Sequence, residues 1–98
     1  MPRRAARVDD NQKEVVKALR QAGATVQHLH TVGSGCPDIL VGFRGINHLM
    51  EIKDGSKPRS KRVLTPDEQE WHDAWRGEVT IVNSADEALF VIGLGFGS

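Results

Sequence analysis

Two short apolar runs, residues 39–43 and 48–52, are separated by four residues and predict a β-hairpin. Charged residues interrupt the apolar pattern: Asp38 stands just before the first run, Glu51 lies inside the second, and Lys53 follows it. Strand residues i and i+2 share a face, so Glu51 and Lys53 project to the same side of the strand. These charges are costly in an apolar strand unless a divalent metal and a scissile phosphate pair with them. Two carboxylates and a lysine in this arrangement suit hydrolysis of a phosphodiester.

The length of the hairpin turn decides which of these charged groups face each other. Residues 44–47 contain the turn formers Gly and Asn. A two-residue turn places Asp38 opposite Glu51, whereas a four-residue turn places Asp38 opposite Lys53. In either register the charged groups lie within about one residue pair, where cross-strand Cβ atoms are ~5 Å apart. Oxygen ligands at this spacing suit Mg²⁺ or Mn²⁺ better than Zn²⁺, and we therefore predict one of these two metals.

The rest of the chain predicts helices and strands around this hairpin. One apolar helix face is made by Val15, Val16, Leu19 and Ala22. The predicted elements are a helix over residues 10–22, a strand over 24–31, the two hairpin strands, a helix from 66 to near 77, a strand over 78–82 and a final helix after 84. This α-β-β-β-α-β-α order predicts an α+β fold in which helices flank a mixed sheet.

Two of the predicted helices begin with a capping box. Thr65 precedes Pro66, which favours the first helical position, and Glu68 stands three residues after the cap. Ser84 and Glu87 repeat the same spacing before the last helix. The sequence therefore fixes the starts of these helices more sharply than their ends.

The spacing of the charged residues resembles a known signature. Pro37-Asp38, twelve further residues and then Glu51-Ile52-Lys53 resemble the PD-(D/E)xK motif of restriction-endonuclease-like nucleases. The flanking segments 9–12, 33–36 and 64–69 extend the similarity to the VRR-NUC (virus-type replication-repair nuclease) domain, especially its stand-alone phage and prophage members, over residues 8 to 92. The resemblance implies a restriction-endonuclease-like core and a metal-dependent DNA endonuclease. It also implies a homodimer that acts on branched DNA such as Holliday junctions.

The resemblance assigns roles to individual residues of the signature. Asp38 and Glu51 would bind the metal, together with the backbone carbonyl of Ile52. Lys53 would orient or activate the attacking water and stabilise the developing negative charge. Gln69 corresponds to a glutamine that such families place near the active site.

An acidic residue on the first helix also belongs to the family pattern. Asp9, Asp10 and Glu14 all compete for that place. Asp9 or Asp10 serves equally well as the cap of the helix. The sequence leaves this choice open.

The formal net charge is zero, but the charges are segregated along the chain. Basic residues gather in an N-terminal arm, residues 1–8, and in a loop, residues 54–64, that follows the predicted catalytic strand. We expect both segments to contact DNA phosphates through Arg3, Arg4, Arg7, Lys57, Arg59, Lys61 and Arg62. A solvated loop without a partner is the alternative.

Composition indicates one small domain over residues 1–98, with a flexible tail at residues 94–98. A chain of this size buries a modest core, so a homodimer would add stability. The apolar stretches are too short to span a bilayer, and we expect no membrane partner and no small-molecule cofactor besides the metal. Cys36 is the single cysteine, which excludes an internal disulfide and suits a reducing cytoplasm. The resemblance to phage and prophage proteins implies that this is the cytoplasm of a bacterial host.

Two tryptophans and two histidines are candidates for other functions, such as base stacking and zinc binding. Trp71 and Trp75 lie one helical turn apart, a spacing more typical of a core or a dimer interface than of base stacking. His28 and His30 share a strand face, but their spacing matches no standard zinc site. Two further functions stay open: a catalytically silent DNA-binding module, and a small protein-interaction domain that uses the Trp71/Trp75 face.

Overall fold

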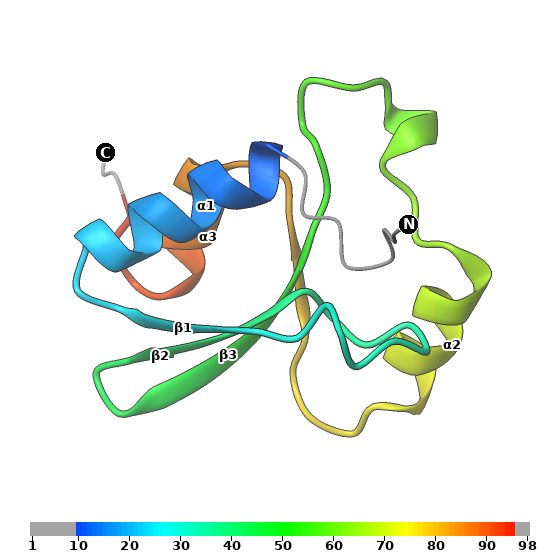
Figure 1. The fold of residues 1–98 in the computed structure, drawn as a ribbon, viewed down its shortest axis with the longest axis horizontal. Helices are drawn as coiled ribbons and strands as arrows, with labels where there is room; N and C mark the ends of the chain where they lie inside the picture. Colours follow the sequence, from blue (N-terminus) through cyan, green and yellow to red (C-terminus); the bar gives the residue numbers. More distant parts are fainter. Residues whose placement is uncertain (1–9, 96–98) are drawn as a thin grey trace, which may run out of the picture.

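The computed structural model describes residues 10–95, and these form one four-stranded sheet flanked by helices (Figure 1). The elements are α1 (Asp10–Gln21), β1 (Thr25–His28), β2 (Ile39–Phe43), β3 (Ile46–Ile52), the short 3₁₀ helix η1 (Arg59–Lys61), α2 (Pro66–Ala74), β4 (Thr80–Val82) and α3 (Ala85–Val91). The strands are ordered β1-β2-β3-β4; the first two pairings are antiparallel and β3–β4 is parallel. The predicted element order and the mixed sheet are confirmed. The predicted first strand was too long, because only four of its residues pair with β2.

The β2–β3 hairpin has the shorter of the two predicted turns. Phe43 pairs with Ile46, so Arg44 and Gly45 form a two-residue loop. Both loop residues have positive φ, 53° and 81°, as a type I′ turn requires. The four-residue alternative, which placed Asp38 opposite Lys53, is wrong.

The core lies between the sheet and one helical layer. Helices α1 and α3 pack together on one face of the sheet, while α2 lies apart from them (Figure 1). The fully buried side chains of this core include Val15, Leu19, Ile39, Val41, Met50 and Val82. Each such side chain contributes roughly 1.5–3 kcal/mol when it leaves water, so this layer carries most of the folding free energy. Within residues 10–95, no helix is both long and apolar enough to cross a membrane.

Glycines end the two core helices in the same way. Gly23 follows α1 with φ +99°, and Gly93 follows α3 with φ +101°. In each case the next residue donates its N–H to a carbonyl five residues earlier, from Ala24 to Leu19 and from Leu94 to Leu89. These caps satisfy carbonyls that would otherwise lack partners at the helix ends.

Helix α2 does not pack in the hydrophobic core; its first turn instead makes a close backbone contact with the loop before β2. None of its residues is buried, so of the two predicted places for Trp71 and Trp75 the core is wrong, and the dimer interface stays a prediction. Their rings stack on each other, with centroids 4.6 Å apart, and Trp75 is 45% exposed. A Cβ built on Gly35 would lie 2.2 Å from the carbonyl oxygen of Asp67, so the loop before β2 touches the first turn of α2.

Candidate active site

Asp38 lies where the β2–β3 ladder ends. The last pair of the ladder is Ile39 with Met50, and the backbone N–H of Asp38 donates to the Met50 carbonyl at 3.0 Å. The Asp38 carboxylate accepts a hydrogen bond of 2.7 Å from the N–H of Ile52. The carboxylate thus takes the place of a strand carbonyl at the end of the sheet. The two-residue turn therefore brings Asp38 beside the segment that carries Glu51, although the ladder stops one residue short of pairing them.

Glu51 and Lys53 project from the same side of β3, as the strand alternation predicts. Glu51 is 2% exposed, and its Oε2 lies 3.6 Å from the Nζ of Lys53. The second oxygen of Glu51, Oε1, is buried and has no hydrogen-bond partner among the described residues. A buried carboxyl oxygen without a hydrogen-bond partner is unusual in a protein interior, because leaving such an atom unpaired costs free energy.

A third carboxylate, which the sequence analysis assigned only to a helix cap, reaches the same place. Glu68 Oε1 accepts a 2.7 Å hydrogen bond from the Nζ of Lys53. The same oxygen accepts the N–H of Thr65 at 2.9 Å, so the capping box of α2 is complete. Lys53 is therefore hydrogen-bonded to the first turn of α2. Fifteen residues separate the two partners, and no sequence spacing predicts such a contact.

The electrostatics of the cluster show an excess of negative charge. Burial, followed by the charges of Asp38 and Glu68, raises the pKa of Glu51 to about 9. Burial likewise raises the pKa of Asp38. Burial alone would lower the pKa of Lys53, but its hydrogen bond to Glu68 and the surrounding carboxylates outweigh it and raise that pKa. At neutral pH these shifts keep Lys53 charged and leave the Glu51 carboxyl mostly protonated.

The donor set fits Mg²⁺ or Mn²⁺ better than zinc. Within residues 10–95, no group of three or more His, Cys, Asp or Glu side chains could hold a metal ion. A metal held by Asp38 and Glu51 would need further oxygens from the backbone or from water, and Mg²⁺ is commonly held in that way. The N–H of Ile52 points at Asp38, and the carbonyl of a strand residue points to the same side as its N–H.

The acids of α1 lie around a separate pocket. Asp10 and Glu14 line a pocket of about 500 Å³ together with Asn11, Asp54, Gly55, Ser56, Arg62, Asn83, Ser84 and Glu87. Asn11, also on α1, donates its side-chain amide to the Lys53 carbonyl at 2.6 Å. Asp9, the third candidate for the first-helix acid, lies outside the described residues.

Gln69 makes its hydrogen bond within α2. Its amide donates to the Asp73 carboxylate one turn further along the helix, at 2.9 Å, and the side chain is exposed. The family resemblance implies that Gln69 lies near the active site, but the neighbouring Glu68 is the residue that contacts Lys53. Helix phase explains the difference, because adjacent helical residues point about 100° apart.

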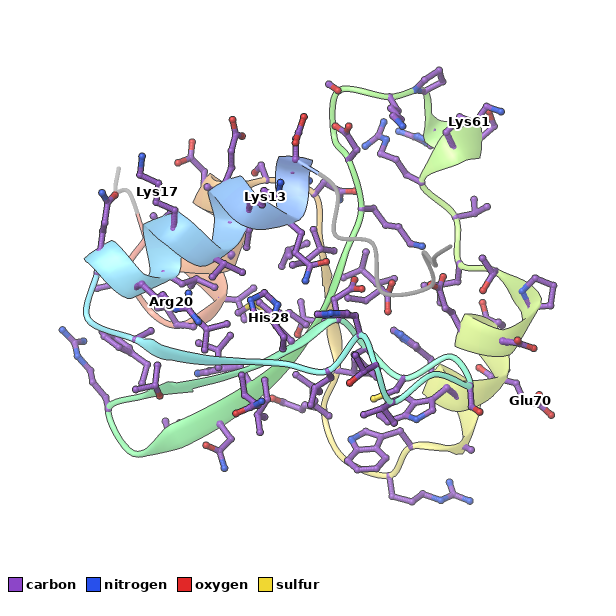
Figure 2. The ribbon with its side chains drawn as sticks, viewed as in Figure 1. Lys13, Lys17, Arg20, His28, Lys61 and Glu70 are labelled. Carbon is purple, nitrogen blue, oxygen red and sulfur yellow. The ribbon has the colours of Figure 1, made fainter. Side chains whose placement is uncertain are left out.

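The basic loop rises beside the end of β3, and Lys61 lies near its tip (Figure 2). Lys57, Arg59 and Lys61 are exposed. Arg62 is half-buried beside the acidic pocket, and its Nε has no hydrogen-bond partner within residues 10–95. Arg3, Arg4 and Arg7 lie outside the described residues.

The order of the elements, the mixed sheet and its flanking helices define a nuclease-like fold. The chain is similar to a solved structure described as "VRR_NUC domain", with a TM-score of 0.60 and 26% sequence identity. The match covers 83% of this chain and 88% of that structure. No protein-family model and no curated protein matches the sequence.

Proposed function

We propose that this chain is a metal-dependent endodeoxyribonuclease of the PD-(D/E)xK type. The observation that carries the proposal is the buried, orphaned carboxylate of Glu51 beside Asp38 and Lys53, within a VRR-NUC-like fold. Asp38, Glu51 and the Ile52 carbonyl would hold the metal. When bound, Mg²⁺ or Mn²⁺ supplies Lewis-acid stabilisation of the phosphate and lowers the pKa of a bound water.

The chain's own residues would orient the reaction. The ammonium of Lys53, held by Glu68 at 2.7 Å, would donate to the attacking water or to a phosphate oxygen. Asn11 bonds to the Lys53 carbonyl and fixes the backbone at the end of β3. The resemblance also assigns Gln69 to the site, and its amide would have to leave Asp73 to reach it.

Cleavage of a panel of labelled DNAs tests this function. We expect cutting of one or more of four-way junction, flap, splayed-arm, duplex and single-stranded DNA with Mg²⁺ or Mn²⁺, and none with EDTA. Branched DNA is the substrate we propose, with a homodimer as the active form. Sedimentation with and without junction DNA tests the dimer, and a monomer in both states would oppose junction resolution. Turnover that persists in EDTA would contradict metal-dependent chemistry.

A catalytically silent DNA-binding module is the second candidate. The observation that favours it is the short ion pair between Lys53 and Glu68, which occupies the lysine. DNA binding without cleavage in either metal would support this candidate. Absence of both binding and cleavage would point to a protein partner for the Trp71/Trp75 face.

The Glu68→Gln variant separates a positioning role for Glu68 from a sequestering one. We expect its kcat to fall about 10-fold, because a charge-assisted hydrogen bond worth about 1.5–3 kcal/mol no longer holds Lys53. The control is Thr65→Ala, which removes the hydroxyl cap at a cost of about 1 kcal/mol but leaves the contact between Glu68 and Lys53. Single-turnover cleavage and urea denaturation measure both effects. A faster Glu68→Gln enzyme would show that Glu68 restrains Lys53.

A further inference from the structure

Helix α1 carries a row of cations that lies outside the segments predicted to bind DNA. Lys13, Lys17 and Arg20 follow at i, i+4 and i+7 and so lie along one side of α1. In Figure 2 Lys13 and Lys17 lie above His28 of β1, and Arg20 lies beside it, between α1 and the sheet. The helical rise places Lys13 and Arg20 about 10 Å apart along the axis. We call these three cations together with His28 the α1 flank.

The α1 flank encloses a shallow pocket that contains no acid. The pocket has a volume of about 480 Å³ and is lined by Lys13, Val16, Lys17, Arg20, Gln21 and His28. The acids near the start of α1 instead line the separate pocket beside residues 54–56. The positive charge of the flank is therefore not balanced by a carboxylate in the pocket wall.

The two lysines have no ionic partner in the part of the chain that the structure describes. The salt bridges found between residues 10 and 95 both belong to Lys53. Arg20 is directed across the pocket and donates to the carbonyl of Val26 at 3.3 Å. Asp10 and Glu14 stand three residues before Lys13 and Lys17, a spacing at which helical side chains are neighbours, but neither acid forms a salt bridge with a lysine in the described part of the chain.

The α1 flank continues to the candidate active site through β1. His28 pairs with Ile39, the residue that follows Asp38. The next backbone N–H, that of Leu29, donates to the carbonyl of Asp38 at 2.9 Å. His28 also lies 3.3 Å from the side-chain amide of the buried Gln12. The backbone of β1 therefore connects the flank to Asp38, the proposed metal ligand, whereas the side chains of His28 and Glu51 project from opposite faces of the sheet.

We propose that the α1 flank binds backbone phosphates of the DNA whose cleavage we propose above. This inference rests on the proposed function and adds a second phosphate-contacting surface to the basic loop. Phosphates on one strand are spaced by about 3.4 Å of helix rise, so a row of about 10 Å covers about three such intervals. A duplex arm that leaves the candidate active site would run along α1. The flank would contact its phosphates and not its bases, so this binding would not depend on the DNA sequence.

Two charge-matched double variants test the α1 flank. Lys13→Gln/Lys17→Gln removes two cations of the flank, whereas Arg44→Gln/Arg76→Gln removes two exposed cations from the β2–β3 turn and the end of α2. Binding of a labelled duplex is measured by anisotropy in EDTA between 50 and 200 mM salt. For the flank variant we expect about 10-fold weaker binding at 100 mM salt and a salt slope smaller by about two. The control should bind within about 2-fold of wild type.

The outcomes separate this inference from the proposed nuclease activity. At saturating DNA the flank variant should cut at the wild-type rate, because its residues do not touch the reacting atoms. Equal weakening of both double variants would attribute the loss to net charge and overturn the inference. Unchanged binding by a flank variant that still folds would overturn it too. A wild-type protein that binds duplex DNA but never cuts it would contradict the proposed nuclease activity. The comparison of the two double variants would still show whether the α1 flank binds DNA.

Discussion

The Glu51→Gln variant is expected to lose roughly 10³-fold in cleavage rate and yet to be more stable than wild type without metal at pH 8. The loss follows because the variant removes one of the two carboxylates proposed to hold the metal. The gain follows because Glu51 is 2% exposed, has one oxygen without a partner, and lies near Asp38 and Glu68. A neutral amide of the same size avoids the cost of ionising that position.

Glu51 should make the free energy of unfolding depend on pH. Glu51 has a pKa of about 9 in the folded protein against an ordinary value of 4.5. Between these two pH values the folded state holds a proton that the unfolded state has lost. The contribution of Glu51 to the free energy of unfolding therefore decreases as pH rises through that window. Glu51→Gln should remove this decrease, and added Mg²⁺ should offset it in wild type.

Urea denaturation at pH 6 and pH 8, with and without Mg²⁺, measures this effect beside single-turnover cleavage. Glu70→Gln is the matched control, because Glu70 is an exposed residue of α2. It should change neither stability nor cleavage. A destabilised Glu51→Gln protein would instead identify the pair of Glu51 and Lys53 as a structural ion pair.

The second large effect is expected from Gly35→Ala. The new Cβ would lie 2.2 Å from the Asp67 carbonyl oxygen and 2.9 Å from the Glu68 nitrogen, both of them backbone atoms. Gly35 also has φ +81°, which alone costs a residue with a side chain about 1–2 kcal/mol. Overpacking adds about 1–3 kcal/mol, so α2 should move away from the loop and release Lys53 from Glu68. The rate of DNA cleavage should therefore fall as well.

Hydrogen exchange locates this effect within the molecule. We expect faster exchange in α2 and unchanged protection in α1 and the sheet, because α2 contributes no buried residue to the core. Gly33→Ala is the control: its φ is +77°, but its Cβ would meet nothing within 4 Å. Equal exchange in the two variants would show that backbone strain, and not the contact with α2, decides the result.

The sequence predicted those parts of the fold that depend on local pattern. The hairpin, its charged face and the order of elements follow from period-two alternation and turn residues, and these local rules hold here. The Thr65 capping box is complete. The second box is incomplete, because Ser84 accepts the N–H of Glu87 but the Glu87 carboxylate turns to the N–H of Asn83.

The features that the sequence did not predict depend on contacts between distant segments. The pairing of Lys53 with Glu68 and the approach of Gly35 to Asp67 join residues that no periodicity relates. The same cause explains why the core, one of the two predicted places for Trp71 and Trp75, is wrong. Helical spacing shows that the two rings share a side of α2, but it cannot show whether the core covers that side.

The location of the two tryptophans has a consequence for spectroscopy. Trp71 lies within α2 and Trp75 is its C-cap residue, and they are the only tryptophans of the chain. Intrinsic tryptophan emission therefore reports the local environment of this outlying helix, whereas far-UV circular dichroism reports the helices and sheet together. Agreement between the two signals would show that α2 melts with the core, and an earlier change in emission would mark it as a separately unfolding unit.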